Sequence, residues 1–304
     1  MFDVIKYKKY YFIFSFLLII PGLISLVLYG LNLSIDFTGG SRIALQFPQN
    51  VNQRVVEDTR GTFEREGVEV ATIQRSGRSV FLRTEPVNEK ENTKLLTELS
   101  KKYKGISQQE FVTIGPTVGR ETAIKALQAV VTASVLIVIY IAWSFRKVPK
   151  PTSSWRFGVG AVVALIHDAI LLLGVFSLLG HFYGVEIDSL FITAILTVIG
   201  FSVHDTIVVF DRIRENLLRE AGQPFEKVVN DSILQTLNRS LNTSFTALLV
   251  LLALLLFGGD SIKWFTAALF IGLLSGTYSS IFNAAPLLVA WDEWDKKRKR
   301  KSSK

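Results

Sequence analysis

The sequence of 304 residues contains no cysteine. This absence excludes disulfide bonds, thiolate nucleophiles and cysteine-ligated metal sites, although it says little about the cellular compartment. Long polar connections are scarce as well, because residues 31–121 form the only one. The rest of the chain consists of long apolar runs joined by short links.

Hydrophobic side chains make up 49% of the sequence, and the mean hydropathy is +0.35. One soluble core of this length rarely hides so much apolar surface, so the composition indicates a membrane protein. A spanning helix needs about 20 mostly apolar residues. We expect six such helices, at approximately residues 10–30, 123–143, 157–180, 187–210, 241–258 and 264–290. The first is too long for a secretory signal and lacks a cleavage site, so we expect it to be retained.

Lysine and arginine collect on one side of these segments, within residues 6–9, 146–156, 212–227 and 296–301. The positive-inside rule makes that side cytoplasmic, so both termini are expected there. The tryptophans fall at segment ends, where aromatic rings meet lipid headgroups: Trp143, Trp155, Trp264, Trp291 and Trp294. The net charge of +8 lies on these flanks and the tail, which favours the lipid bilayer over nucleic acid as its partner.

Residues 31–121 have the composition of a folded domain, placed outside the cytoplasmic membrane by the same rule. Periodicity predicts a strand at 41–47, a helix at 51–67, two strands within 68–84 around the turn Ser76-Gly77, a helix at 88–103 and a strand at 106–115. The order β-α-β-β-α-β indicates a small ferredoxin-like α+β domain. It has no histidine and no glycine-rich phosphate loop, so we expect a binding or moving element.

Two apolar segments each contain a His-Asp pair, His167-Asp168 in LIHDAI and His204-Asp205 in SVHDTI. Insertion scales give an aspartate at the centre of a spanning helix a cost of about 2.5–3.5 kcal/mol, so it usually faces a partner or a water-filled path. The repetition favours a polar track through the bundle. Helix packing remains an alternative for Asp168 and for both histidines.

Arg239 stands at the cytoplasmic start of the fifth segment, and Asp205 lies about 9 Å inside the corresponding end of the fourth. The two could therefore meet at similar depth, and alternation between a protonated carboxyl and an ion pair could drive a helix rearrangement. The alternative is that Arg239 only belongs to the positive belt. Elsewhere, a stripe of small residues indicates close helix packing in the sixth segment: Gly272, Gly276, Ser280 and Ala284.

Several motifs together resemble the SecF family, the smaller subunit of the SecD/SecF accessory complex of the bacterial protein-export channel. They are LSIDFTGG (33–40), GPTVGRE (115–121), the His-Asp pair of the third segment, SVHDTIVVFDRIREN (202–216) and LNRSLNTS (237–244). The resemblance runs from the first segment to the basic tail. The family is related to the resistance-nodulation-division transporters.

The resemblance implies an α-helical multi-pass protein of the bacterial inner membrane whose six spans are half of a twelve-helix bundle. Its parts would be the N-terminus and first span (1–30), the extracytoplasmic domain (31–121), the other five spans (122–291) and a basic cytoplasmic tail (292–304). The implied partners are SecD, the SecY/SecE/SecG channel and a translocating polypeptide, pulled or released by proton or sodium flow. No enzymatic reaction and no cofactor are implied.

The family's transport aspartate falls on Asp205 and its arginine on Arg239. His204 replaces an asparagine of many relatives, so proton handling could differ, and Asp168 completes the expected ion-coupling set. The loop residues 36–40 look like a strand start that fixes the outer domain on its helix. The expected structural motif consists of Asp36, Thr38, Gly39, Gly40, Gly115 and Glu121.

Two other functions fit parts of the pattern. A small-molecule efflux protein of the same superfamily would normally carry both halves in one chain and larger outer domains. An intramembrane aspartyl protease would use Asp168 and Asp205 as a carboxylate pair that shares a proton. The Gly-x-Gly-Asp pattern expected of such a protease is missing.

Overall fold

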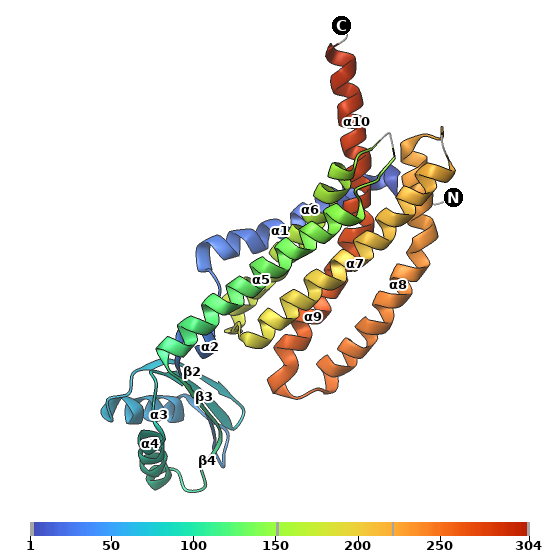
Figure 1. The fold of residues 1–304 in the computed structure, drawn as a ribbon. Helices are drawn as coiled ribbons and strands as arrows, with labels where there is room; N and C mark the ends of the chain where they lie inside the picture. The colour runs from blue at the N-terminus through green and yellow to red at the C-terminus, as the bar shows by residue number, and fades with distance from the viewer. Residues whose placement is uncertain (1–2, 150–151, 221, 303–304) are drawn as a thin grey trace. The chain divides into compact units, whose positions relative to one another are not determined.

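The computed structural model describes residues 3–149, 152–220 and 222–302 (Figure 1). Lys150 of the basic belt and the last two residues of the tail lie outside the described residues. The chain forms two compact units, one of residues 1–32 with 129–304 and one of residues 33–128. The first unit is helical, and the second contains the sheet.

Six helices of the described chain are long and apolar enough to cross a membrane, as the hydropathy predicts. The first is α1 (Lys8–Tyr29), which follows a 3₁₀ turn, η1 (Ile5–Tyr7). The next four are α5 (Pro116–Ser144), α6 (Ser154–Tyr183), α7 (Ser189–Arg219) and α8 (Phe225–Phe257). The sixth runs through α9 (Asp260–Ser279), a π-helical turn η2 (Ser280–Ala284) and α10 (Ala285–Ser302).

The fourth and fifth helices extend far beyond their apolar segments. Helix α7 has 31 residues and α8 has 33, so each is about 45–50 Å long at 1.5 Å per residue. The hydrocarbon core is only about 30 Å thick. The polar residues beyond the expected bounds, 211–219 and 225–240, are therefore helical continuations of the spans. Arg239 lies well inside α8 rather than at its start.

Close backbone approaches hold the helical unit together. A Cβ added at Gly22 of α1 would lie 2.8 Å from the Cα of Gly174 in α6, so the two helices cross with no room for a side chain. Gly272 and Gly276 of α9 similarly face Val198 and Ser202 of α7. Small residues at helix crossings allow such approaches in membranes, and this is the packing that the small-residue stripe predicts.

Polar contacts join one end of this unit. The backbone N–H of Val4 donates to Oδ1 of Asn230 in α8 over 2.9 Å. Lys8 at the start of α1 pairs with Glu293 of α10 over 2.7 Å. The start of α1 and the part of α10 around Glu293 therefore lie at the same end of the bundle (Figure 1).

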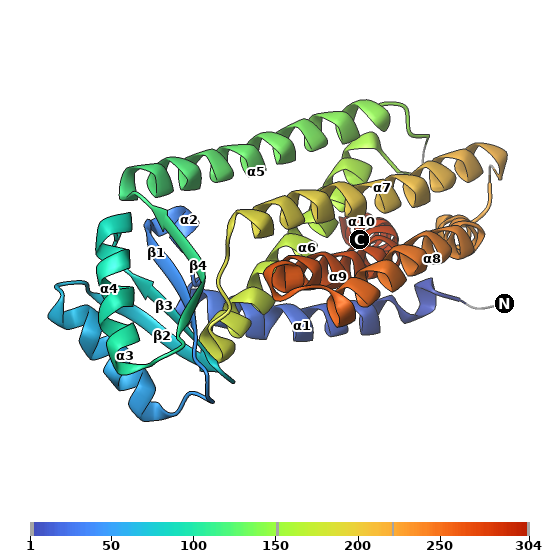
Figure 2. The same ribbon diagram turned by 90° about the horizontal axis from the view of Figure 1, so that it is seen from below.

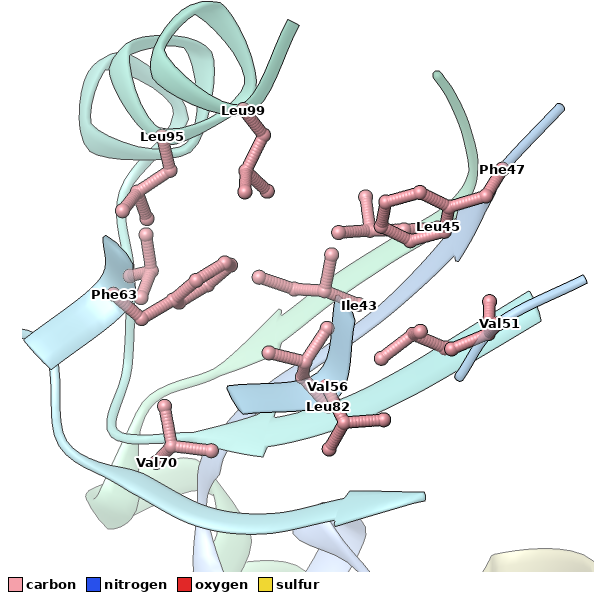
Figure 3. Close-up of a cluster of buried hydrophobic side chains, with 12 residues drawn as sticks. Ile43, Leu45, Phe47, Val51, Val56, Phe63, Val70, Leu82, Leu95 and Leu99 are labelled. Atoms are coloured by element: carbon pink, nitrogen blue, oxygen red, sulfur yellow. The ribbon is translucent and has the colours of Figure 1, made fainter. Parts of the chain in front are cut away.

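The second unit contains a four-stranded antiparallel sheet in the order β2-β3-β1-β4. Its strands are β1 (Gly40–Gln46), β2 (Val70–Ser76), β3 (Ser79–Thr84) and β4 (Ser107–Ile114). Helices α3 (Gln53–Arg65) and α4 (Glu89–Lys102) cover one face. Figure 3 shows Phe63 of α3 and Leu95 and Leu99 of α4 directed at Ile43 and Leu45 of β1. The expected β-α-β-β-α-β order is confirmed.

The entrance to this unit differs from the expectation. Residues 36–38 do not start a strand but belong to a single helical turn, α2 (Ile35–Thr38), and β1 begins at Gly40. Ser34 caps the turn by accepting the N–H of Asp36 at 3.2 Å. A serine or aspartate near a turn offers the backbone such local hydrogen bonds in place of a strand ladder.

Candidate functional site

A column of buried hydroxyl and carboxylate groups runs between α6, α7, α8 and α9. Its members lie inside spans that are otherwise apolar: Asp168, Ser202, Asp205, Thr206, Ser244, Ser275, Thr277, Ser279 and Ser280. Buried polar groups without partners are costly in such surroundings. The hydrogen bonds of each carboxylate therefore show what it can do.

Asp168 on α6 is fully buried and fully satisfied. Its Oδ2 accepts from Ser202 Oγ at 2.5 Å and from Ser279 Oγ at 2.6 Å. Its Oδ1 accepts from Ser275 Oγ at 2.6 Å and contacts His167 Nδ1 at 2.9 Å. Three helices are thus joined at one carboxylate, which is the arrangement of a structural anchor.

Asp205 on α7 is 3% exposed, yet it has far weaker support. Its Oδ2 accepts one hydrogen bond, from Ser244 Oγ of α8, at 3.4 Å. Ser244 itself accepts from Thr277 Oγ1 of α9 at 2.7 Å. In the described chain no ion pair reaches this carboxylate. Asp205 is therefore a buried acid with spare acceptor capacity.

The other two members of the expected ion-coupling set are not part of the column. Arg239 has an exposed side chain, and no ion pair joins it to Asp205 within the part of the chain that the structure describes. Ser240, the next residue on α8, is buried, so Arg239 lies beside the face that contacts α7. His204 is also exposed.

Among the serines and threonines of the column, only Ser280 was singled out from the sequence, as a small packing residue. Ser275 and Ser279 are four residues apart and so lie on one face of α9, which is a signal that could have been used. Ser202 lies three residues before Asp205, and Ser244 directly follows Thr243. Nothing in a single sequence distinguishes them from hydroxyls that bond their own helix.

The two aspartates do not form a catalytic pair. Asp168 is held by α9 and by Ser202, whereas Asp205 contacts Ser244, and among the described residues no hydrogen bond links the two carboxylates. Within the same part of the chain, no group of three or more His, Asp or Glu side chains could hold a metal ion. The arrangement lacks the shared proton that an aspartyl protease requires.

The glycine pair at the entrance of the sheet unit is tightly enclosed. Gly39 has a φ of +74°, and a Cβ there would lie 2.7 Å from the Cα of Pro116; Gly40 has a φ of +121° and faces the carbonyl of Thr84 at 2.6 Å. A side chain at Gly119 would meet the Gly39 nitrogen at 2.6 Å. The chain entering the domain thus crosses the chain leaving it at backbone contact.

The other members of that motif are less constrained. A Cβ at Gly115 would meet nothing within 4 Å. Glu121 is exposed and pairs with Lys125 one helical turn later, over 2.6 Å. Thr38 donates to the Ser34 carbonyl at 3.1 Å, and its Oγ1 also accepts from Arg83 of β3 at 2.5 Å. These contacts fix the turn at the entrance and leave Asp36 as part of it.

Comparison with known proteins assigns the buried column and the glycine pair to the same protein family. The family model for the C-terminal part of the protein export membrane protein SecD/SecF matches residues 94–294, and the SecD/SecF GG motif matches residues 24–51. The second match includes Gly39 and Gly40. The first includes the whole buried column.

Relatives that match nearly the whole of this chain belong to the same family. The protein translocase subunit SecF of Thermobaculum terrenum is 46% identical over 97% of this chain and 95% of its own length. The protein translocase subunit SecDF of Bacillus subtilis is 38% identical over 95% of this chain, which spans 38% of that protein. A crystal structure of SecDF from Thermus thermophilus, a translocon-associated membrane protein, aligns with a TM-score of 0.83 at 34% identity. That alignment covers 96% of this chain and 39% of the SecDF chain.

Proposed function

The chain belongs to the SecF group of the SecD/SecF family of protein-export membrane proteins, and we propose that it couples a transmembrane proton or sodium gradient to polypeptide export through Asp205. It is a multi-pass translocase subunit and not an enzyme or a drug-efflux protein.

The contrast between the two buried aspartates is the observation that carries the proposal. A carboxylate that acts as an ion carrier has to exchange partners, and Asp168, with four hydrogen bonds, has no capacity left for another. Asp205 has one bond at 3.4 Å in a buried position. Intramembrane acids with this environment mark ion and proton paths.

Arg239 supplies a counter-charge for the second state of this carboxylate. It lies five residues before Ser244 on α8, about 7.5 Å along the axis, and borders the buried face at Ser240. When Asp205 is neutral, the Ser244 bond suffices. When Asp205 loses its proton or sodium ion, a rotation of α8 brings the guanidinium to the charge, and the helix moves with each cycle.

The transmembrane potential is large enough to drive such a cycle. Moving one charge across the membrane yields about 2.3 kcal/mol per 100 mV. That energy exceeds a single neutral hydrogen bond such as the one from Ser244, which is worth about 0.5–1.5 kcal/mol net. Ion passage can therefore replace the Ser244 contact by the Arg239 contact.

SecD is the partner that the relatives support. In Bacillus subtilis and Thermus thermophilus the corresponding sequence is part of a longer SecDF chain. We propose that this chain pairs with a separate SecD, that the pair acts at the SecY/SecE/SecG channel on the outer side of the bacterial inner membrane, and that both termini are cytoplasmic. The sheet unit would then contact the emerging polypeptide.

The test is ion flux and secretion in vesicles that contain this chain and SecD under an imposed proton or sodium gradient. Asp205→Asn keeps the shape and the Ser244 bond but removes the exchangeable charge, so both activities should fall at least about tenfold. The matched control is Asp231→Asn, the same change at a carboxylate of α8 outside the column, which should keep wild-type rates. Wild-type flux and export in Asp205→Asn would end the coupling proposal.

Arg239 allows an independent check. Arg239→Gln should reduce flux as Asp205→Asn does, while Arg239→Lys should retain part of it because the charge remains. If Arg239→Gln transports ions normally, the positive charge only belongs to the interface belt. SecD binding should persist in every variant, which pull-down from detergent would show.

A further inference from the structure

A pocket of about 390 Å³ lies at the end of α5, against the second half of α7. Its walls come from the last turns of α5, the segment after it and the middle of α7. The charged residues among its lining are Arg146, Lys147, Asp211 and Arg214. All of them belong to the helical unit.

The pocket carries excess positive charge. Arg214 pairs with Asp211 over 2.6 Å, so these two cancel. Arg146 and Lys147 are exposed and have no carboxylate partner in the described part of the chain. Three cations against one carboxylate leave a surplus of two positive charges.

The same pocket has an apolar and aromatic side. Trp143 and Tyr140 are both exposed at its rim, and the Arg146 guanidinium lies 4.8 Å from the centre of the Trp143 ring. Tryptophan and tyrosine with this exposure at the end of a span occupy the depth of lipid headgroups. The pocket therefore lies where phosphate groups meet hydrocarbon.

Helix α5 leaves room for lipid beside the pocket. In the part of α5 from Ala129 to Ser144, which the structure describes in full, Ile141 is the only fully buried residue. Leu136 and Ile139 are among the exposed side chains of this part. Figure 2 shows α5 along the edge of the bundle. A spanning helix with so little protein around it is covered by acyl chains or by another chain.

We propose that this pocket binds the headgroup phosphate of an anionic phospholipid, with Arg146 and Lys147 as its ligands and the acyl chains against α5. Guanidinium and ammonium groups bind phosphate through charge-assisted hydrogen bonds, and basic pockets between spans are typical anionic-lipid sites. A nucleic acid or an acidic protein would not use the apolar wall. Free phosphate would use only the cations.

Native mass spectrometry of the purified full chain tests the site. Phosphatidylglycerol is expected to bind more tightly than phosphatidylcholine. Arg146→Gln with Lys147→Gln should weaken phosphatidylglycerol binding by about tenfold. Lys6→Gln with Lys9→Gln removes two exposed cations elsewhere in the helical unit and should leave it unchanged. Equal binding of both lipids, or no loss in the first double variant, overturns the proposal.

Two further arms separate a lipid site from alternatives. Asp211→Asn removes the one carboxylate of the pocket, so phosphatidylglycerol should bind about threefold more tightly. A folding defect cannot produce that gain. Inorganic phosphate and glycerol phosphate at millimolar concentration should fail to displace the lipid. Displacement by either would show a phosphate site without a lipid preference, and the proposal would be wrong.

Discussion

At the scale of single residues, two aspartates in the same dipeptide context have different environments. Asp168 gathers hydroxyls from α7 and α9, and Asp205 has one long contact with α8. The sequence suggested a common polar track for both. It could not separate them, because the difference lies in which serines the neighbouring helices present.

Asp168→Asn should destabilise the helical unit by about 3 kcal/mol. The amide has one acceptor oxygen, so at least one of the Ser202, Ser275 and Ser279 hydroxyls would lose its partner in a buried site. Thermal unfolding in detergent, compared with Asp205→Asn, measures this. Asp205→Asn should unfold close to wild type, and equal losses in both variants would contradict the assignment of Asp168 as the anchor.

A second residue cluster joins the two helices of the sheet unit. Tyr103 Oη donates to Asp58 Oδ2 at 2.7 Å, and Lys102 pairs with Asp58 Oδ1 at 2.6 Å. The hydrogen bonds from Lys102 and Tyr103 lower the pKa of Asp58. Burial, followed by the bond to Asp58, raises the pKa of Tyr103 from 10.0 to about 12.

The stability that this cluster provides should depend on pH at both extremes. The pKa of Asp58 is lower in the folded state, so its contribution is full above the unfolded value of 3.8 and is lost as the pH falls through the folded value. The pKa of Tyr103 is higher in the folded state, so its contribution is lost as the pH rises from 10.0 to about 12.

Tyr103→Phe should therefore speed amide hydrogen exchange in α4 at neutral pH, because it lowers the free energy of local opening by about 1–2 kcal/mol. The difference from wild type should shrink as the pH falls from 7 towards 2, because protonation of Asp58 weakens this bond. Exchange mass spectrometry at both pH values measures it. A difference that is the same at pH 7 and pH 2 would assign the loss to packing of the ring instead.

At the scale of elements, hydropathy predicted each span and the periodicity predicted each strand, because burial of apolar side chains decides both. Helix ends in water were not predictable in this way. The fifth span was expected to begin near residue 241, but α8 already begins at Phe225. The prediction that Asp205 and Arg239 lie at similar depth came from counting residues. The side of α8 on which Arg239 lies depends instead on packing against α7 and α9.

The turn before β1 shows the same limit. The sequence marked Gly39 and Gly40 as structural, but the reason for each is tertiary: Pro116 and Thr84 come from distant parts of the chain. Composition could not supply these neighbours. It also could not predict that Gly115, in the same motif, is unconstrained.

Gly39→Ala should prevent correct closure of the sheet unit, because the residue has a φ of +74° and its Cβ would lie 2.7 Å from backbone. Gly115→Ala, with nothing within 4 Å, is the matched control and should behave as wild type. Limited proteolysis of the full chain in detergent distinguishes them. Equal resistance of both variants would show that the crossing can widen without cost.

At the scale of the whole molecule, six spans among the described residues would place the start of α1 and the end of α10 on one side of a membrane. The start of α1 and the helix α10 share one end of the bundle, and the basic residues accumulate there. The sequence predicted this arrangement because lysine and arginine are concentrated in the connections on one side of a membrane protein. Which face is cytoplasmic is a question for labelling.

The absence of cysteine makes that labelling simple. A single cysteine in place of Asp3 or Arg298 should react with a membrane-impermeant maleimide only after the inner membrane is permeabilised. A single cysteine in place of Gln109, on β4, should react in spheroplasts without permeabilisation. Labelling of both positions from outside, or of Gln109 only from inside, would reverse the assigned orientation.

The pairing of β1 with β4 has an evolutionary consequence. The chain enters the sheet unit through one strand of the central pair and leaves through its neighbour, with Gly40 opposite Ile114. Entry and exit are therefore adjacent, and the segment between them closes on itself. Such a segment can be exchanged for another, or shortened to a hairpin, without moving the spans that flank it, so the export machinery can acquire new outer domains by insertion while its membrane half stays unchanged.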